Sequence, residues 1–160
     1  MRIQEIGFRL RQARAERGVS QSALAKSASV SRTLLNQFES GLLPDITISK
    51  LQALLEKVEL ALAAEPRPPG RPDFVAMACT TASVSYRHPL TESELIRALL
   101  TGKPSPGKRA NFRTLFDEAP QSLLDGVVDE VGQWTKPGRV RKNVASIAQE
   151  IGSVRNVAHD

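Results

Sequence analysis

The chain has 160 residues, of which 24% are charged and 41% hydrophobic, and its formal net charge is +5. This length suits one medium domain or two small ones, and the composition predicts a folded, soluble protein. The surplus of basic residues suits an anionic partner, although a charge of this size is a weak argument by itself.

Several classes of site are excluded by residue usage. A single cysteine, Cys79, allows no intrachain disulfide, so a reducing cytoplasm is the expected compartment. Two distant histidines, His88 and His159, do not make a metal site, and we expect no metal and no cofactor. No stretch approaches the ~20 apolar residues of a membrane span, and no signal peptide heads the chain. No Ser-His-Asp or Cys-His signature supports catalysis, so an enzyme is not expected.

A first helix is predicted from about Gln4 to Arg17, with Gly18 ending it. Its inner stripe holds Ile6, Leu10 and Ala13. Arginines are frequent in and just before this helix, at Arg2, Arg9, Arg11, Arg14 and Arg17. They form either a phosphate-binding cluster or a solvated face paired with Glu5 and Glu16.

Residues 20–41 predict two short helices joined by a tight turn. Ser20 caps the first helix, Ser31 caps the second, and Gly41 suits a left-handed residue after the second helix ends near Ser40. Small residues allow the two helices to approach closely, and apolar residues of the second face the first. The residues with these roles are Ala25, Ala28, Val30, Leu35 and Phe38.

The opposite stripe of the second helix carries a row of polar side chains: Arg32, Thr33, Asn36 and Gln37. Arginine can bond O6 and N7 of guanine, and asparagine or glutamine can bond N6 and N7 of adenine. Threonine offers a methyl to thymine and a hydroxyl to a base edge or phosphate. A solvated helix face would also be polar, but the tight helix-turn-helix setting favours base reading.

From about residue 6 to residue 62 the chain resembles the Xre/Cro-repressor type of helix-turn-helix domain. The matching residues are Leu10, Arg14, Gly18-Val19-Ser20-Gln21, Leu24-Ala25, Val30-Ser31-Arg32, Phe38-Glu39-Ser40-Gly41 and Leu51. The resemblance implies a five-helix, lambda-repressor-like fold with a structural glutamate at Glu39. It also implies that Arg32, Thr33 and Gln37 read bases and that Gln21 meets a phosphate. We add Ser20, Ser31 and Arg14 as phosphate candidates, and note that the turn has Ser29 where the family usually has glycine.

After Pro44, Thr47 caps a fourth helix whose apolar positions are Ile48, Leu51, Leu54, Leu55 and Val58. The segment from Val58 to Glu65 then alternates with period two, and we predict a short strand at 60–64. The HipB-like antitoxin branch of the family often carries such a strand and pairs it with a second subunit. The alternative is a frayed continuation of the fourth helix, because alanine, leucine and glutamate favour helices.

The predicted DNA-binding domain therefore spans 1–65. Residues 66–89 are interpreted as a proline-rich linker followed by an extended segment, although the alanine and methionine content of 74–87 leaves a helix open. Residues 90–160 predict a small helical C-terminal domain, and the fold class is mainly α. Thr91 and Glu94 form a capping box for its first helix, which Gly102 ends. Further helices are expected at about 109–118, from Pro120 to near Trp134, and at about 140–154.

Two basic segments of the second half have open interpretations. Lys103–Arg109 with Arg113, and Arg139, Arg141 and Lys142, either contact phosphate or an acidic partner or are exposed basic segments. The second run stands at a helix N-terminus, the unfavourable end for cations, which hints at an external anion. Asp125, Asp129 and Glu130 are interpreted as a solvated face.

These patterns predict a cytoplasmic, homodimeric repressor that binds double-stranded DNA at a palindromic operator through the helix at 31–40. One alternative is the antitoxin of a toxin–antitoxin system, which represses its own operon and binds the toxin through residues 90–160. A second alternative is a protein-interaction scaffold with a degenerate helix-turn-helix.

Overall fold

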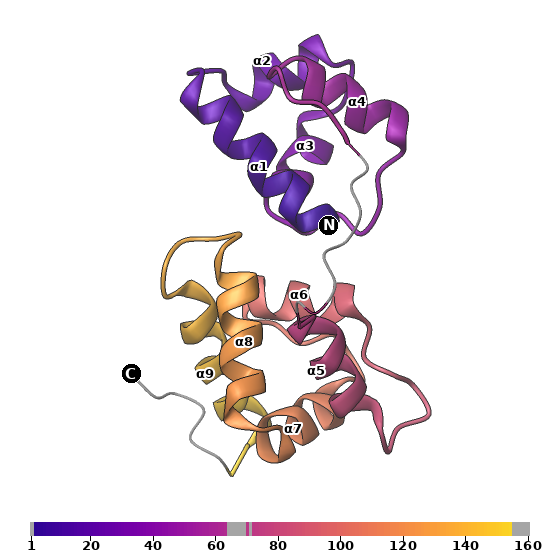
Figure 1. Ribbon diagram of the computed structural model, residues 1–160, viewed down its shortest axis with the longest axis vertical. Coiled ribbons are helices and arrows are strands. Elements are labelled where there is room, and N and C mark those ends of the chain that lie inside the picture. Colours follow the sequence, from indigo (N-terminus) through magenta and orange to yellow (C-terminus); the bar gives the residue numbers. More distant parts are fainter. Residues whose placement is uncertain (1, 64–69, 71, 155–160) are drawn as a thin grey trace. The chain divides into compact units, whose positions relative to one another are not determined.

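The computed structural model describes residues 2–63, 70 and 72–154. It divides the chain into two compact units, Met1–Pro69 and Gly70–Asp160. Each unit has its own hydrophobic core, and every regular element among the described residues is a helix (Figure 1).

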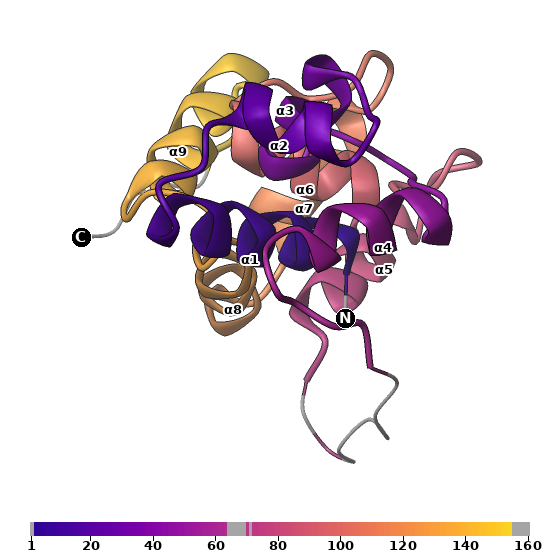
Figure 2. The same ribbon diagram turned by 90° about the horizontal axis from the view of Figure 1, so that it is seen from above.

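The first unit contains four helices within the described residues: α1 (Ile3–Glu16), α2 (Gln21–Ser27), α3 (Arg32–Glu39) and α4 (Ile48–Glu56). Helix α3 packs against both α1 and α2, and Figure 2 shows α2 and α3 next to one another. The buried core of the unit comprises Leu10, Ala13, Leu24, Ala25, Ala28, Leu35, Phe38, Leu51, Leu54, Leu55 and Val58. The expectation of a fifth helix in this unit is not met within the described residues.

The turn between α2 and α3 depends on a left-handed residue. Ser29 has φ +54°, and the amide of Val30 donates to the carbonyl of Ala25 at 3.0 Å. A side chain in this conformation costs about 1–2 kcal/mol relative to glycine. The departure from the family pattern at Ser29 therefore has a real energetic consequence.

The predicted strand at 60–64 is wrong for residues 60–63, and residue 64 lies outside the described residues. Helix α4 is also not continued, because Glu59 is left-handed at φ +56° and the amide of Leu60 donates back to Leu55 at 3.0 Å. This reversal places Leu60 against the first core. Period-two spacing here reflects a helix end that folds back rather than a strand.

The second unit begins with a helix that the sequence interpretation treated as extended. Helix α5 (Phe74–Ser83) starts at Asp73, whose carboxylate accepts the amide of Ala76 at 2.9 Å. Its buried residues, Val75, Ala78, Cys79 and Ala82, follow helical spacing. The extended segment predicted within 66–89 is therefore wrong at 74–83; residues 66–69 and 71 lie outside the described residues.

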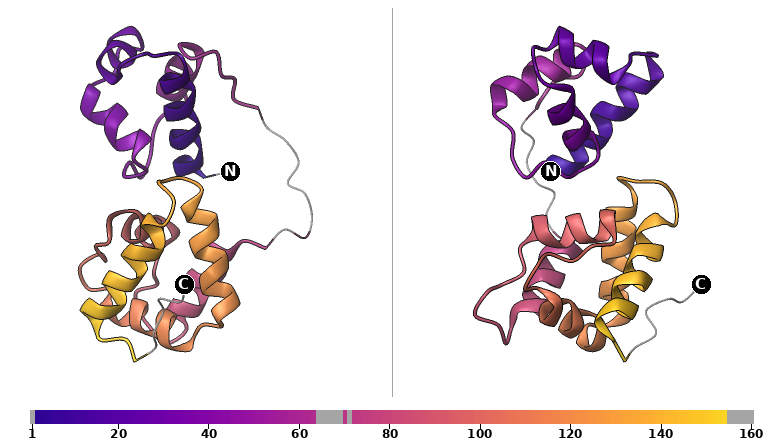
Figure 3. Two further views of the ribbon diagram at one scale, coloured as in Figure 1. Left: turned by 90° about the vertical axis from the view of Figure 1, so that its left-hand side faces the viewer. Right: turned by 180° about the vertical axis from the view of Figure 1, so that it is seen from behind.

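Four more helices complete the second unit among its described residues: α6 (Glu92–Thr101), α7 (Arg109–Glu118), α8 (Gln121–Gly132) and α9 (Arg139–Ile151). The Thr91–Glu94 capping box is present, and Gly102 ends α6 at φ +74°. Helix α5 packs against α6, α7 and α8, while α8 lies beside α9 (Figure 3). The four helices predicted after residue 90 are thus confirmed, with boundaries shifted by a few residues at most.

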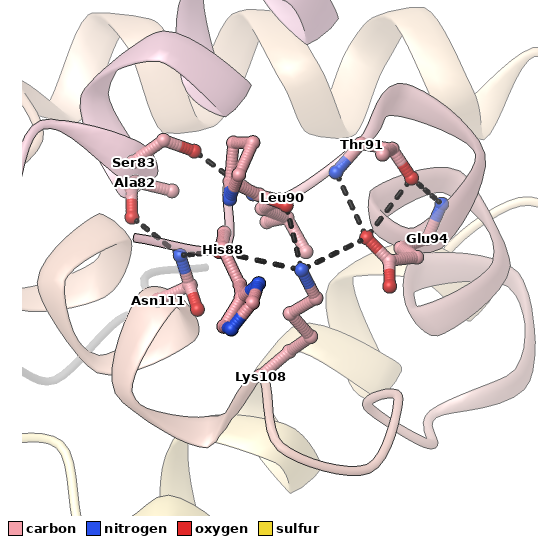
Figure 4. A network of polar contacts seen from close by, with 9 residues as sticks. Ala82, Ser83, His88, Leu90, Thr91, Glu94, Lys108 and Asn111 are labelled. Atoms are coloured by element: carbon pink, nitrogen blue, oxygen red, sulfur yellow. Dashed lines mark hydrogen bonds and ion pairs between the residues drawn. The ribbon is translucent and has the colours of Figure 1, made fainter. Parts of the chain in front are cut away.

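A polar clamp holds the connection between α5 and α6 (Figure 4). The buried amide of Asn111 donates to the carbonyls of Ala82 at 3.0 Å and His88 at 3.4 Å. Lys108 Nζ donates to the carbonyl of Pro89 at 2.6 Å and lies 3.5 Å from Glu94 Oε2. Helix α7 therefore fixes the path of the chain between α5 and α6.

Candidate nucleic-acid interface

Helix α3 separates an apolar face from a polar one. Leu35 and Phe38 are 0% and 1% exposed in the first core. The predicted base-reading residues are all exposed, on the other stripe: Arg32, Thr33, Asn36 and Gln37. The side chains of Arg32, Thr33 and Gln37 have no hydrogen-bond or ion-pair partner among the described residues, so their donors are available to an external ligand.

Two serine caps stand at the starts of α2 and α3. Ser20 Oγ accepts the amide of Ala23 at 3.1 Å, and Ser31 Oγ accepts the amide of Leu34 at 3.1 Å. Both serines are exposed. Because a capping hydroxyl uses only acceptor capacity, each O–H remains a donor for an anion such as a phosphate.

A buried ion pair ties α3 to α1. Arg14 Nε and NH2 donate to Glu39 Oε1 and Oε2 at 2.6 and 2.8 Å, a bidentate arrangement. Arg14 NH1 also donates to the carbonyl of Val19 at 2.8 Å. The Glu39 side chain is 2% exposed and that of Arg14 14%. The hydrogen bond with Glu39 raises the pKa of Arg14, a shift that burial opposes and the charge of Glu39 reinforces, so Arg14 stays protonated.

The same carboxylate reaches α2. Gln21 Nε2 donates to Glu39 Oε2 at 2.8 Å and lies 3.5 Å from Asn36 Oδ1. Glu39 therefore joins side chains of α1 and α2 to α3, which fixes the reading helix relative to its support. This geometry agrees with the structural role that the family resemblance implies for Glu39.

The network changes the expected roles of two residues. Each of the three guanidinium nitrogens of Arg14 already donates within the protein, so we assign Arg14 to the support and leave it out of the phosphate contacts proposed below. Gln21 keeps one amide hydrogen that is engaged only by the long contact to Asn36. Gln21 and Asn36 therefore lie together at the α2–α3 junction. If the long contact between them is broken, both side-chain amides become available to an external ligand.

One residue that sequence reasoning missed is Gly7, in the middle of α1. A Cβ at this position would lie 2.2 Å from the carbonyl oxygen of Phe38, closer than real Cβ atoms come to backbone. Glycine is therefore what allows α1 to cross the end of α3. A glycine inside an amphipathic helix was the available signal, since it is otherwise unfavourable there by about 1 kcal/mol.

The basic segment from Lys103 to Arg113 lies elsewhere, in the second unit, and much of it is used internally. Lys108 belongs to the polar clamp described above. Arg109 NH2 pairs with Glu150 Oε1 at 2.6 Å, and Arg113 NH2 donates to the carbonyl of Ile151. These arginines meet the last carbonyls of α9, where cations are favourable. A structural role therefore accounts for Lys108, Arg109 and Arg113.

No group of three or more potential metal-ligating residues occurs in the described part of the chain. None of the described helices is long and apolar enough to cross a membrane.

Comparison with known proteins matches residues 5–66 to a family described as a helix-turn-helix domain. The match covers most of α1 and all of α2, α3 and α4, and it confirms the resemblance to Xre-like helix-turn-helix domains drawn from the motif residues. No match was found among curated proteins or among solved structures.

Proposed function

We propose that this protein, whose residues 5–66 form a helix-turn-helix domain, is a sequence-specific transcriptional repressor that inserts α3 into the major groove. The observation that carries the proposal is the exposed stripe of α3 backed by the buried Glu39 network. Side chains free to bond bases stand on a helix held by three polar contacts to its neighbours. Such fixed placement is what discrimination between base edges needs.

Base contacts are assigned to Arg32, Thr33, Asn36 and Gln37. Arg32, near the start of α3, suits guanine, whereas Asn36 and Gln37 suit adenine and Thr33 the methyl of thymine. Phosphate contacts are assigned to Ser20, Gln21 and Ser31, which flank this stripe at the starts of α2 and α3. Phosphate contacts set the register of the helix, and base contacts then select the sequence.

A homodimer on a palindromic operator is proposed because the DNA-reading helix, α3, is short. Helix α3 has eight residues and can touch only a few base pairs, too few for selectivity in a genome. Two copies related by a two-fold axis would place their reading helices one DNA turn apart, about 34 Å. The dimer interface is not assigned, since the strand that would have formed it is absent at 60–63.

The antitoxin alternative was favoured by the strand predicted at 60–64, and residues 60–63 do not form a strand. The scaffold alternative remains an outcome of the experiment: a degenerate helix-turn-helix would enrich no DNA sequence.

The decisive experiment selects duplexes from a random pool with the full chain and measures affinity for the enriched sequence and for unselected DNA. The variant Arg32→Ala/Gln37→Ala should lose about 10- to 100-fold in affinity for the enriched sequence, the range of one to two lost base contacts. Binding to unselected DNA should persist, because phosphate contacts supply it.

Arg11→Ala/Gln12→Ala is the matched control, since it removes the same two residue types from an exposed part of α1. This variant should keep the preference for the enriched sequence. If both variants keep that preference equally, α3 is not the reader. A monomeric protein with enriched sites that lack two-fold symmetry would contradict the dimer.

A further inference from the structure

The end of α6 meets the start of α9 in the second unit. Asn143 Nδ2 donates to the carbonyl of Leu99 at 2.7 Å. A Cβ at Gly102 would lie 3.1 Å from Asn143 Oδ1, so the chain leaves α6 in contact with the second turn of α9. The backbone that continues from Gly102 to Lys103 therefore starts beside the second turn of α9.

Four exposed cations gather at this junction, and we call them the junction patch: Lys103, Lys136, Arg139 and Lys142. Their side chains have no hydrogen-bond or ion-pair partner among the residues that the structure describes. Arg141 already interacts within the protein and is left out. No acidic residue occurs from Val131 to Gln149, and none stands in the first turn of α9.

This arrangement does not serve the stability of α9. Cations beside a helix N-terminus oppose the helix dipole, and like charges in one patch repel each other. The cations of α7 show the opposite arrangement, since Arg109 and Arg113 meet the carboxyl end of α9. The junction patch is thus a positively charged surface whose cations have no acidic partner among the described residues.

We propose that the junction patch binds the phosphate backbone of the DNA whose sequence α3 reads. This inference rests on the proposed function and adds a second, sequence-independent contact to it. From Leu60 to Phe74 the chain can span at most about 50 Å, because an extended backbone covers roughly 3.5 Å per residue. Once α3 is docked, the patch is therefore confined near the same duplex at high effective concentration.

The test uses the full chain and measures affinity for a duplex of about 30 base pairs, roughly three helical turns, over a series of salt concentrations. Arg139→Gln/Lys142→Gln should weaken binding to enriched and random sequences by the same factor. The slope of log affinity against log salt should become shallower by about 1.8, since each lost phosphate contact accounts for roughly 0.9.

Arg87→Glu is the control, because it lowers the net charge by the same amount in the loop before α6. The length of α6, about 15 Å, lies between this loop and the patch. The control should leave the salt slope within about 0.5 of the parent value. The control should melt at the parent temperature because Arg87 is exposed, and the patch variant should melt at or slightly above it, because its neutral side chains no longer oppose the dipole of α9.

Three outcomes would overturn the inference. If the parent binds with sequence preference while the patch variant keeps the parent slope, the patch has another partner, such as an acidic protein, and the proposed function stands. If the control reproduces the loss, the effect comes from net charge rather than from the patch. If the parent binds no DNA, the inference and the proposed function both fail.

Discussion

The two units differ in where their polar side chains make contacts. In the first, charged side chains lie inside the molecule, where Glu39 joins α1, α2 and α3. In the second, the core is apolar around α5, and the polar contacts stand at helix ends and loops, as in the clamp of Figure 4. A buried ion pair contributes little net stability compared with apolar residues, but it fixes geometry. The difference indicates that the polar contacts of the first unit fix the placement of α3, whereas those of the second unit fix the connection between α5 and α6.

The unfolding of the two units can be followed separately with spectroscopic signals of the chain itself. Its single tryptophan, Trp134, packs on the second core, so tryptophan fluorescence follows the second unit alone. Far-ultraviolet circular dichroism follows the helices of both units. A substitution in the first unit should therefore move the circular-dichroism transition and leave the fluorescence transition in place.

The largest expected effect comes from Glu39→Gln. This substitution leaves the charge of Arg14 without a counter-charge in a site that is 14% exposed, which should destabilise the first unit by about 3 kcal/mol. Urea unfolding followed by circular dichroism measures the loss. Glu59→Gln, which breaks the exposed pair with Arg17, serves as the control and should change little. Equal effects of the two substitutions would show that the buried network does not hold α3.

The next effect concerns the crossing of α1 and α3. Gly7→Ala places a methyl 2.2 Å from the carbonyl oxygen of Phe38, so the two helices must separate at a cost of about 2 kcal/mol. The transition of the first unit should fall in thermal unfolding. Gly132→Ala, at the end of α8 with open space around its Cβ, should instead stabilise the second unit by up to about 1 kcal/mol. If Gly7→Ala left the melting temperature of the first unit unchanged, the close approach of α1 to the end of α3 would be contradicted.

A smaller effect, of opposite sign, is expected at the turn between α2 and α3. Ser29→Gly relieves a left-handed side chain and should stabilise the first unit by about 0.5–1 kcal/mol. The melting temperature of that unit should rise by a few degrees. Ser22→Gly, inside α2, should lower it, because there glycine only adds backbone freedom. A rise in both variants would mean that the conformation of Ser29 is not the cause.

The smallest effect is a pH dependence of the second unit. Although partial burial raises the pKa of Glu94, hydrogen bonds from Thr91 and the charge of Lys108 outweigh it and lower that pKa below the ordinary value of 4.5. Glu94 therefore stabilises the folded unit above pH 4.5, and this contribution is lost as pH falls through the lowered pKa. The stability difference between the parent and Glu94→Gln, followed by Trp134 fluorescence, should shrink over that interval. Glu118→Gln, at the exposed end of α7, is the control, and a constant difference for Glu94→Gln would contradict the pairing.

Predictions from the sequence were confirmed where a structural feature depends only on residues that are neighbours in the chain. The sequence could predict helix caps and helix-ending glycines because each acts within one helical turn. The caps are Ser20, Ser31 and Thr91, and the helix-ending glycines are Gly18 and Gly102. The sequence left both an extended segment and a helix open at 74–87, because this stretch is rich in β-branched residues and also in alanine, and the structure has a helix there. The strand at 60–63 was wrong because period two also arises where a helix end reverses.

What the sequence determined by itself is the nature of the reader: two capped helices, an apolar face and a polar stripe at Arg32, Thr33, Asn36 and Gln37. These features follow from helical periodicity, which is a property of consecutive residues. Only the tertiary structure decided that Arg14 supports Glu39, that Gly7 lets α1 cross α3, and that the end of α6 meets the start of α9. Each of these depends on contacts between residues far apart in the chain, and the packing of helices, rather than any local pattern, brings them together.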